Sequence, residues 1–289
     1  MQHILLQTTI EGDRDDWHIG RFGHLKAFLE GLRDENGDPA FRVTARDRDP
    51  VGQPDPVLST LHESDYQQLW LFAVDVGNGL TAEDCAGISR FRRLGGGLLV
   101  TRDHMDLGSS ICSLAGVGAA HHFHSHNPDP DATRHRIDDD VTTDISWPNY
   151  HSGANGDYQR VEAVGDVHPV LRDPESAGGT IAFLPSHPHE GAVGAPPEDP
   201  TSRVILKGCS QCTGRDFNIA VAFEASENGG RAIAESTFHH FADYNWDVAA
   251  GCPSFVSEAP GDGLLQFPEA LRSTKRYVQN IAFWLTGRA

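Results

Sequence analysis

The chain has 289 residues, of which 38% are hydrophobic and 22% charged, proportions typical of a globular protein rather than a disordered one. It carries 23 lysine and arginine residues against 41 aspartate and glutamate residues, a formal net charge of −18 at pH 7. Because nucleic acids and anionic membranes bind basic surfaces, this excess of acid argues against both as partners.

The sequence also predicts a compartment. The first eight residues lack the basic start of a targeting segment and are typical of a strand. No apolar run approaches the roughly 18 residues of a membrane span. The five cysteines are an odd number, which argues against a secreted disulfide framework. We therefore expect a cytoplasmic protein.

The first third of the chain alternates between predicted strands and helices. Leu25, Phe28 and Leu29 recur at helical spacing. The continuous apolar run 69–74 is typical of a strand buried on both faces of a parallel sheet. Thr81 is placed to cap a helix that runs to Leu94. The predicted elements are strand 3–8, helix 23–32, strand 41–45, strand 69–74, helix 81–94 and strand 98–101.

The rest of the chain predicts an edge of shorter strands and a closing helix. Strands are expected at 180–184, 203–206, 217–223 and 231–234, with a hairpin turn at 227–230 and a helix at 268–285. The alternation predicts an α/β fold with a doubly wound, mostly parallel sheet flanked by helices. We expect one domain, 1–289, with a long insertion rich in histidine, aspartate and proline at about 121–160.

A polar turn follows the predicted strand 98–101. The sequence there reads Arg102-Asp103-His104, and in open α/β sheets ligands bind at such strand ends. An aspartate beside a histidine can act as a general base or ligate a metal, so both Asp103 and His104 are candidate catalytic residues. The alternative is that Asp103 caps a helix that begins near Leu107.

The segment 121–126 contains four histidines. If it is extended, His122, His124 and His126 point the same way, and imidazoles on one face can bind zinc. With His104 they form the predicted metal site, and zinc is the expected ion. The alternative is a solvated loop that happens to be rich in histidine.

A further strand end and a loop segment carry candidate catalytic side chains. His239 and His240 follow strand 231–234, and Glu190 follows the segment 184–189. The alternatives are an exposed helix start for the histidines and a solvated loop for Glu190.

A polar sugar pocket is the expected role of four other residues. Trp147 could stack on a sugar face, with Tyr150, His151 and His24 beside it. Trp147 could equally anchor the loop to the core, and His24 could pack at its helix start. The pair Cys209 and Cys212 lacks the further ligands that structural zinc needs, which favours ordinary thiols.

Several short motifs in this order resemble the ThuA-like (trehalose-utilisation) family of the class I glutamine amidotransferase-like superfamily. They are Gly23-His24-Leu25, Gly96–Val100 with the histidine-bearing turn after it, His168–Leu171, Leu184–Glu190, Gly230–Ala234 leading to Phe238-His239-His240, and Asn280–Leu285. The segment 121–160 is not typical of the family, and Phe238 stands where it usually has glycine.

The resemblance implies a flavodoxin-like, amidotransferase-like fold, an acid or base at His239 or His240, carbohydrate-related metabolism and in some members a divalent metal. Amidotransferases place a nucleophilic cysteine on the turn where this chain has Arg102-Asp103-His104, so glutamine amidotransferase activity is excluded.

Two functions remain. The first is a metal-assisted hydrolase or lyase acting on a small polar, carbohydrate-derived substrate, with no nucleotide cofactor. The second is a non-catalytic protein that binds a sugar or metabolite. The oligomeric state is left open, and a homo-oligomer is compatible with either function.

Overall fold

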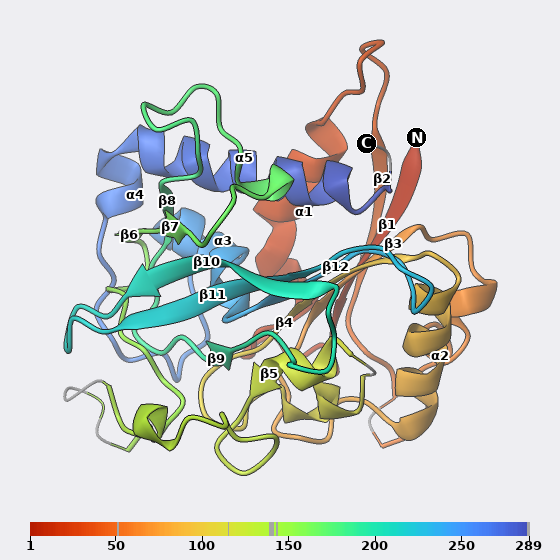
Figure 1. Cartoon of the computed structure of the whole chain (residues 1–289), viewed down its shortest axis with the longest axis horizontal. Coiled ribbons are helices and arrows are strands. Elements are labelled where there is room, and N and C mark those ends of the chain that lie inside the picture. The colour runs from red at the N-terminus through yellow and green to blue at the C-terminus, as the bar shows by residue number, and fades with distance from the viewer. Residues whose placement is uncertain (51, 115, 139–141, 143, 288–289) are drawn as a thin grey trace.

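One eight-stranded sheet runs through the molecule in the order β2-β1-β3-β4-β12-β11-β10-β7 (Figure 1). The structure is a computed structural model and describes residues 1–50, 52–114, 116–138, 142 and 144–287. Strands β2 to β12 in that order pair in parallel, and β12, β11, β10 and β7 pair antiparallel. The strands are β1 Gln2–Thr8, β2 Phe41–Arg46, β3 Gln68–Phe72, β4 Gly97–Thr101, β7 Glu162–Ala163, β10 Ser202–Cys209, β11 Asp216–Phe223 and β12 Ala232–Glu235.

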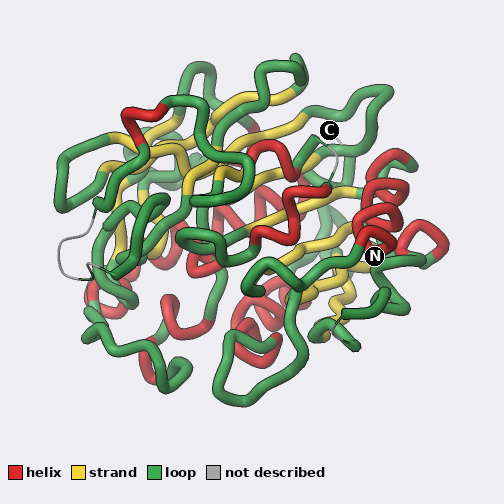
Figure 2. The backbone as a smooth tube through the Cα atoms, turned by 90° about the horizontal axis from the view of Figure 1, so that it is seen from below, coloured by secondary structure: helices red, strands yellow, loops and turns green. Residues whose placement is uncertain are grey.

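Helices cover both faces of the sheet because its parallel strands are apolar on both sides. On one face, α1 and α5 pack against a core that includes Trp70 and Phe72. On the other face, α2 packs with Leu69 and Leu71. Seen from below, loops make up much of the backbone (Figure 2). The helices are α1 Gly23–Gly31, α2 Ala82–Arg93, α3 Asp243–Trp246, α4 Gly263–Gln266 and α5 Pro268–Trp284.

The predicted fold class is confirmed, and so are the local signals that led to it. Thr81 accepts a hydrogen bond from the backbone N–H of Asp84, whose carboxylate accepts one from the N–H of Thr81. β11 and β12 form the predicted hairpin around 227–230. None of the helices in the described part of the chain combines the length and apolar character that a membrane crossing needs.

One predicted strand lies elsewhere, and one alternative is not supported. Strand 180–184 is shorter and shifted: β8 (Phe183–Pro185) pairs with β6 (Tyr158–Arg160) in a separate small sheet, because Ile181 instead bonds to Leu171. The helix near Leu107 that Asp103 was alternatively expected to cap is a short 3-10 helix, and Asp103 does not cap it. It spans Ser109–Ser113 and follows Gly108, whose φ of 85° ends the preceding turn. Asp103 therefore caps no helix, and its carboxylate faces histidines instead.

The insertion at 121–160 contains little regular structure, and its residues 139–141 and 143 lie outside the described residues. β5 covers only His121–His122 and pairs with β9 (Ala192–Val193). The chain then turns, because the N–H of Phe123 donates to the carbonyl of His126 and Asn127 has a φ of 45°. The expectation of an extended segment through His126 is therefore wrong.

His121 in β5 is expected to lower the stability of the fold. Its ring is fully buried, and neither ring nitrogen has a hydrogen-bond partner among the residues that the structure describes. Burial holds the pKa of His121 well below its usual range. An unfolded chain would therefore bind a proton that the folded chain rejects, so stability is lost as the pH falls below about 6.5.

We expect His121→Leu to raise the free energy of unfolding by about 1–3 kcal/mol, since it removes two buried unpaired polar atoms at similar volume. The gain should be larger at pH 5 than at pH 8, because only the wild type carries the proton penalty. Urea unfolding at both pH values measures it. A loss of stability at both would contradict this view of His121.

Candidate functional site

The candidate site lies at the carboxyl ends of β4 and β12, which are neighbours in the sheet. Asp103 and His104 follow β4, and His239 lies in the 3-10 helix Phe238–His240 after β12. His187 comes from the loop after β8. Segments that are far apart in the sequence thus meet at one edge, as expected for ligand sites in this class of sheet.

A buried arginine fixes the turn that carries Asp103 and His104. The guanidinium of Arg102 donates to the carbonyls of Asp103 and Met105, and it also reaches the carbonyl of His122. The hydrogen bonds that the structure shows for Arg102 all go to backbone oxygens, so they hold the loop rather than neutralise the Asp103 carboxylate directly. Burial lowers the pKa of Arg102 to about 9.

Three side-chain atoms face one another at the centre of the site. Asp103 Oδ1 lies 3.3 Å from His104 Nδ1 and 3.5 Å from His187 Nε2. The exposed fractions of the Asp103, His187 and His104 side chains are 6%, 5% and 18%. None of these three atoms has a hydrogen-bond partner among the described residues. Buried polar atoms that face one another without bonding are costly unless something else occupies the space between them.

The hydrogen bonds behind His187 and His239 identify which ring nitrogens carry protons. Asn245 Nδ2 donates to the carbonyl of Ser186 (3.1 Å), which can only accept, and to Asn155 Oδ1 (2.9 Å). His187 Nδ1 must therefore donate to Asn155 Oδ1 (2.9 Å), and His239 Nδ1 must donate to Asn245 Oδ1 (3.0 Å).

In their neutral form, both rings therefore turn an unprotonated Nε2 toward Asp103. His239 Nε2 lies 4.0 Å from Asp103 Oδ2, and the His187 and His239 rings stack with centroids 3.5 Å apart. Two nitrogen lone pairs thus point at a carboxylate, an arrangement that repels unless a cation lies among them.

The ionisation of the group fits this picture. Burial lowers the pKa of His187 to about 4 and that of His239 well below its usual range, so both rings are neutral at pH 7. Burial alone would raise the pKa of Asp103, but the neighbouring histidines, His104 first, hold it well below its usual range. The centre therefore has an ionised carboxylate beside the neutral rings of His187 and His239, which are the protonation states of metal ligands.

Asp103, His104 and His187 form a group that could hold a metal ion. Tetrahedral zinc with bonds of about 2.0–2.1 Å separates its ligand atoms by roughly 3.3–3.4 Å. The distances of 3.3 and 3.5 Å from Asp103 Oδ1 match that separation. Asn155 behind His187 is the kind of outer partner that orients a metal-ligating histidine.

The sequence pointed to Asp103, His104 and His239 but not to His187 as a ligand or to its partners. His189 and Glu258 border the same cluster: His189 Nε2 lies 2.9 Å from Glu258 Oε1, and its ring centroid is 5.3 Å from that of His104. The alternating histidines 187 and 189 after an apolar strand were the signal that could have identified this segment.

Glu190 and His240, also predicted as catalytic, lie in a second buried network. The Glu190 carboxylate accepts from Ser152 Oγ (2.6 Å), Ser236 Oγ (2.8 Å) and Gln159, and His240 bridges it to Glu235. Both side chains are fully buried. The neighbouring His239 and His240 rings therefore serve different networks.

The four predicted sugar-binding residues do not converge on the cluster. Trp147 and Tyr150 lie in the hydrophobic core, Trp147 against His135 and Tyr150 stacked on Phe217. The backbone N–H of His151 donates to Asp138, whereas His24 is exposed at the start of α1. Trp147, which we expected to stack on a sugar, packs against His135 instead.

The structure separates the predicted metal ligands. Among the described residues, the candidate metal group includes only His104 of the four predicted ligands. His122, His124 and His126 are not part of it. His122 Nδ1 contacts the carbonyl of Asn127, and His126 lies exposed beside Ser125. The turn after β5 is the physical reason, because it sends successive side chains in different directions.

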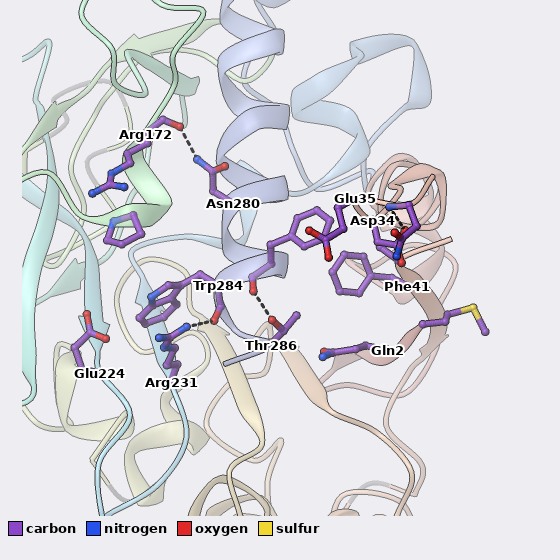
Figure 3. Close-up of a pocket in the computed structure, with 15 residues that line it drawn as sticks. Gln2, Asp34, Glu35, Phe41, Arg172, Glu224, Arg231, Asn280, Trp284 and Thr286 are labelled. Atoms are coloured by element: carbon purple, nitrogen blue, oxygen red, sulfur yellow. Dashed lines mark hydrogen bonds between the residues drawn. The ribbon is translucent and has the colours of Figure 1, made fainter. Parts of the chain in front are cut away.

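A pocket of about 820 Å³ lies at the opposite edge of the sheet, lined by Gln2 of β1 and Phe41 of β2. Figure 3 shows Arg172 and Arg231 on one side of it and Glu35 on the other. It contains none of the residues of the histidine cluster.

No family model matches the chain, and a comparison with curated proteins gives no match. Among solved structures, a ThuA-like protein from Bacteroides uniformis is 12% identical, with a TM-score of 0.46 over 98% of this chain and 91% of its own. The mmIFT52 N-terminal domain is 10% identical, with a TM-score of 0.50 over 98% and 97%. A cytoplasmic protein from Salmonella typhimurium is 12% identical, with a TM-score of 0.44 over 97% and 98%. ThuA-like proteins are thus among the structural neighbours, and at these identities the likeness is one of fold.

Proposed function

We propose that the protein is a metal-dependent enzyme whose divalent ion, zinc, is held by Asp103, His104 and His187. One observation supports this proposal most strongly. Asp103 Oδ1 lies 3.3 Å from His104 Nδ1 and 3.5 Å from His187 Nε2, and all three atoms are buried without a hydrogen-bond partner among the described residues. A bound divalent ion would supply Lewis acidity toward a polar group of the substrate.

The residues around the ion have separate tasks. Asn155 Oδ1 accepts a hydrogen bond from His187 Nδ1. This bond keeps His187 Nε2 free to act as the ligand atom. His239 is held in the same tautomer by Asn245, and its Nε2 is placed to take a proton from a substrate or water beside Asp103. The proposed chemistry is that of a hydrolase or lyase, in which His239 would accept a proton at Nε2.

The convergence of segments favours an enzyme over a binding protein. A binding module could leave its histidines scattered, whereas here residues from the ends of β4, β8 and β12 meet around one carboxylate. The near-complete burial favours a small substrate, and the motifs shared with ThuA-like proteins favour one derived from a carbohydrate. A sugar- or metabolite-binding protein remains the second candidate.

The variant His239→Gln separates the two candidates. We expect it to retain about one metal ion per chain, because the three ligands are intact, and to lose about 10²- to 10⁴-fold in kcat, as typical for removal of a general base. Zinc-loaded wild type and variant would be assayed on a panel of uncharged sugar esters, lactones and keto-sugars. Turnover that does not depend on His239 would contradict its role, and binding without turnover would favour the second candidate.

A further inference from the structure

Residues 251–263, which we call the strap, bond to three segments that lie around the metal cluster. Ser254 donates from its N–H to Asp15 Oδ1 (2.7 Å) and from its hydroxyl to the same carboxylate. Glu258 bonds to His189, two residues after His187. The N–H of Gly261 donates to the carbonyl of Asn155, the residue that orients His187.

The contact between Ser254 and Asp15 also lies near the cluster. Asp15 lies two residues before Trp17, whose ring packs edge-on against His239 with centroids 4.7 Å apart. The strap therefore connects the Trp17 side of the cluster to its His189 side. With the strap in this position, the side chains of Asp103 and His187 are only 6% and 5% exposed.

The strap is mostly exposed, and only Cys252 and Val256 add partial apolar packing against the core to that of Pro253. All thirteen of its residues are described, and Pro253 is the only buried one among them. Residues 251–262 form no helix or strand, and Phe255 leaves 60% of its surface exposed. Its far end, by contrast, is anchored: Gly263 bonds to Asp157, and the next residue, Leu264, is buried in α4.

Segments with few buried apolar contacts and mostly exposed hydrogen bonds open at low free-energy cost. We propose that the strap is a gate over the metal cluster and that the hydrogen bonds Glu258–His189 and Ser254–Asp15 are its two latches. This inference rests on the proposed metal centre. Glu258 is then a positioning residue: it holds the gate closed and contributes no ligand.

Metal exchange tests the gate. Removing a latch should make the strap open more often, while the three metal ligands stay unchanged. Zinc binding and zinc release to excess chelator would be followed by stopped flow for Glu258→Ala and Asp15→Ala. The loss of one hydrogen bond should speed both binding and release about fivefold, with little change in Kd. The control is Asp65→Ala, which removes an exposed carboxylate that pairs with Arg42 and is remote from the strap.

Hydrogen exchange of the metal-free protein gives a second, independent readout. The amides of Ser254 and Gly261 donate to Asp15 and Asn155, and we expect both to exchange faster in Glu258→Ala although neither bonds to Glu258.

The outcomes separate the two claims. If wild type binds zinc but neither variant changes the exchange rates or the strap amides, the gate is refuted and the metal centre stands. A changed Kd at constant binding rate would also refute the gate, because it indicates that Glu258 acts on the ligands through His189. If wild type binds no zinc, the proposed function fails, and the gate fails with it.

Discussion

Asp103→Asn should weaken zinc binding at least about 100-fold. The carboxylate is the only charged ligand of the proposed set, and an amide replaces one of its oxygens with an N–H donor. The two imidazoles that remain, His104 and His187, are too few for a tight site. Competition with a chromogenic chelator at pH 7 measures the change.

A matched variant shows whether the loss is specific to the cluster. Asp106→Asn alters another aspartate of the same turn, one that bonds to Ser125 and not to His187. Its zinc affinity should equal that of wild type. Equal losses in both variants would mean that the turn, rather than the Asp103 carboxylate, determines binding.

His240→Gln should lower the free energy of unfolding by about 3–5 kcal/mol, the largest effect we expect away from the metal cluster. His240 lies between two fully buried carboxylates, 3.5 Å from Glu190 Oε2 and 3.1 Å from Glu235 Oε2. Burial alone would lower its pKa, but the two glutamates raise the pKa of His240 to about 10. Removing the cation leaves their charges facing each other without compensation.

The double variant His240→Gln with Glu235→Gln is the control, because it removes one negative charge together with the positive one. Glu235 also accepts a hydrogen bond from Tyr277 (2.6 Å), which glutamine preserves through its carbonyl oxygen. Stability should recover in part. If the double variant is no more stable than the single one, packing rather than charge explains the loss.

The same histidine gives stability a pH dependence with a defined sign. Its pKa is about 10 in the folded chain and about 6.5 when unfolded, so its contribution is complete below pH 6.5 and disappears as the pH rises through 10. Between those values the wild type should lose up to about 1.4 kcal/mol per pH unit relative to His240→Gln. Chemical denaturation of both proteins from pH 6.5 to 9.5 measures this difference. A constant difference across that range would contradict a charged His240.

The sequence predicted the sheet well because its signals are local. The apolar runs 69–74 and 98–101 and the cap at Thr81 each specify one element, and parallel strands bring their carboxyl ends together whatever the loops do. That is why Asp103, His104 and His239 could be predicted at one edge. The metal ligand set could not be completed in the same way.

The missing parts of the site depend on contacts between loops. His187 belongs to the cluster through β8, which pairs with β6 rather than with the main sheet, and no pattern in the sequence indicates that pairing. The hydrogen bond between Asn155 and Asn245 joins residues ninety positions apart. The histidines at 122, 124 and 126 were attractive because of their density, but their direction depends on a turn at Asn127 that periodicity does not show.

The most direct test is the metal content of protein purified without a histidine tag or added chelator. Elemental analysis would compare wild type with His104→Ala/His187→Ala and with His122→Ala/His124→Ala. Our account predicts about one divalent ion per chain in wild type and in the second double variant, and none in the first. Metal that disappears with His122 and His124, or that persists without His104 and His187, would contradict it.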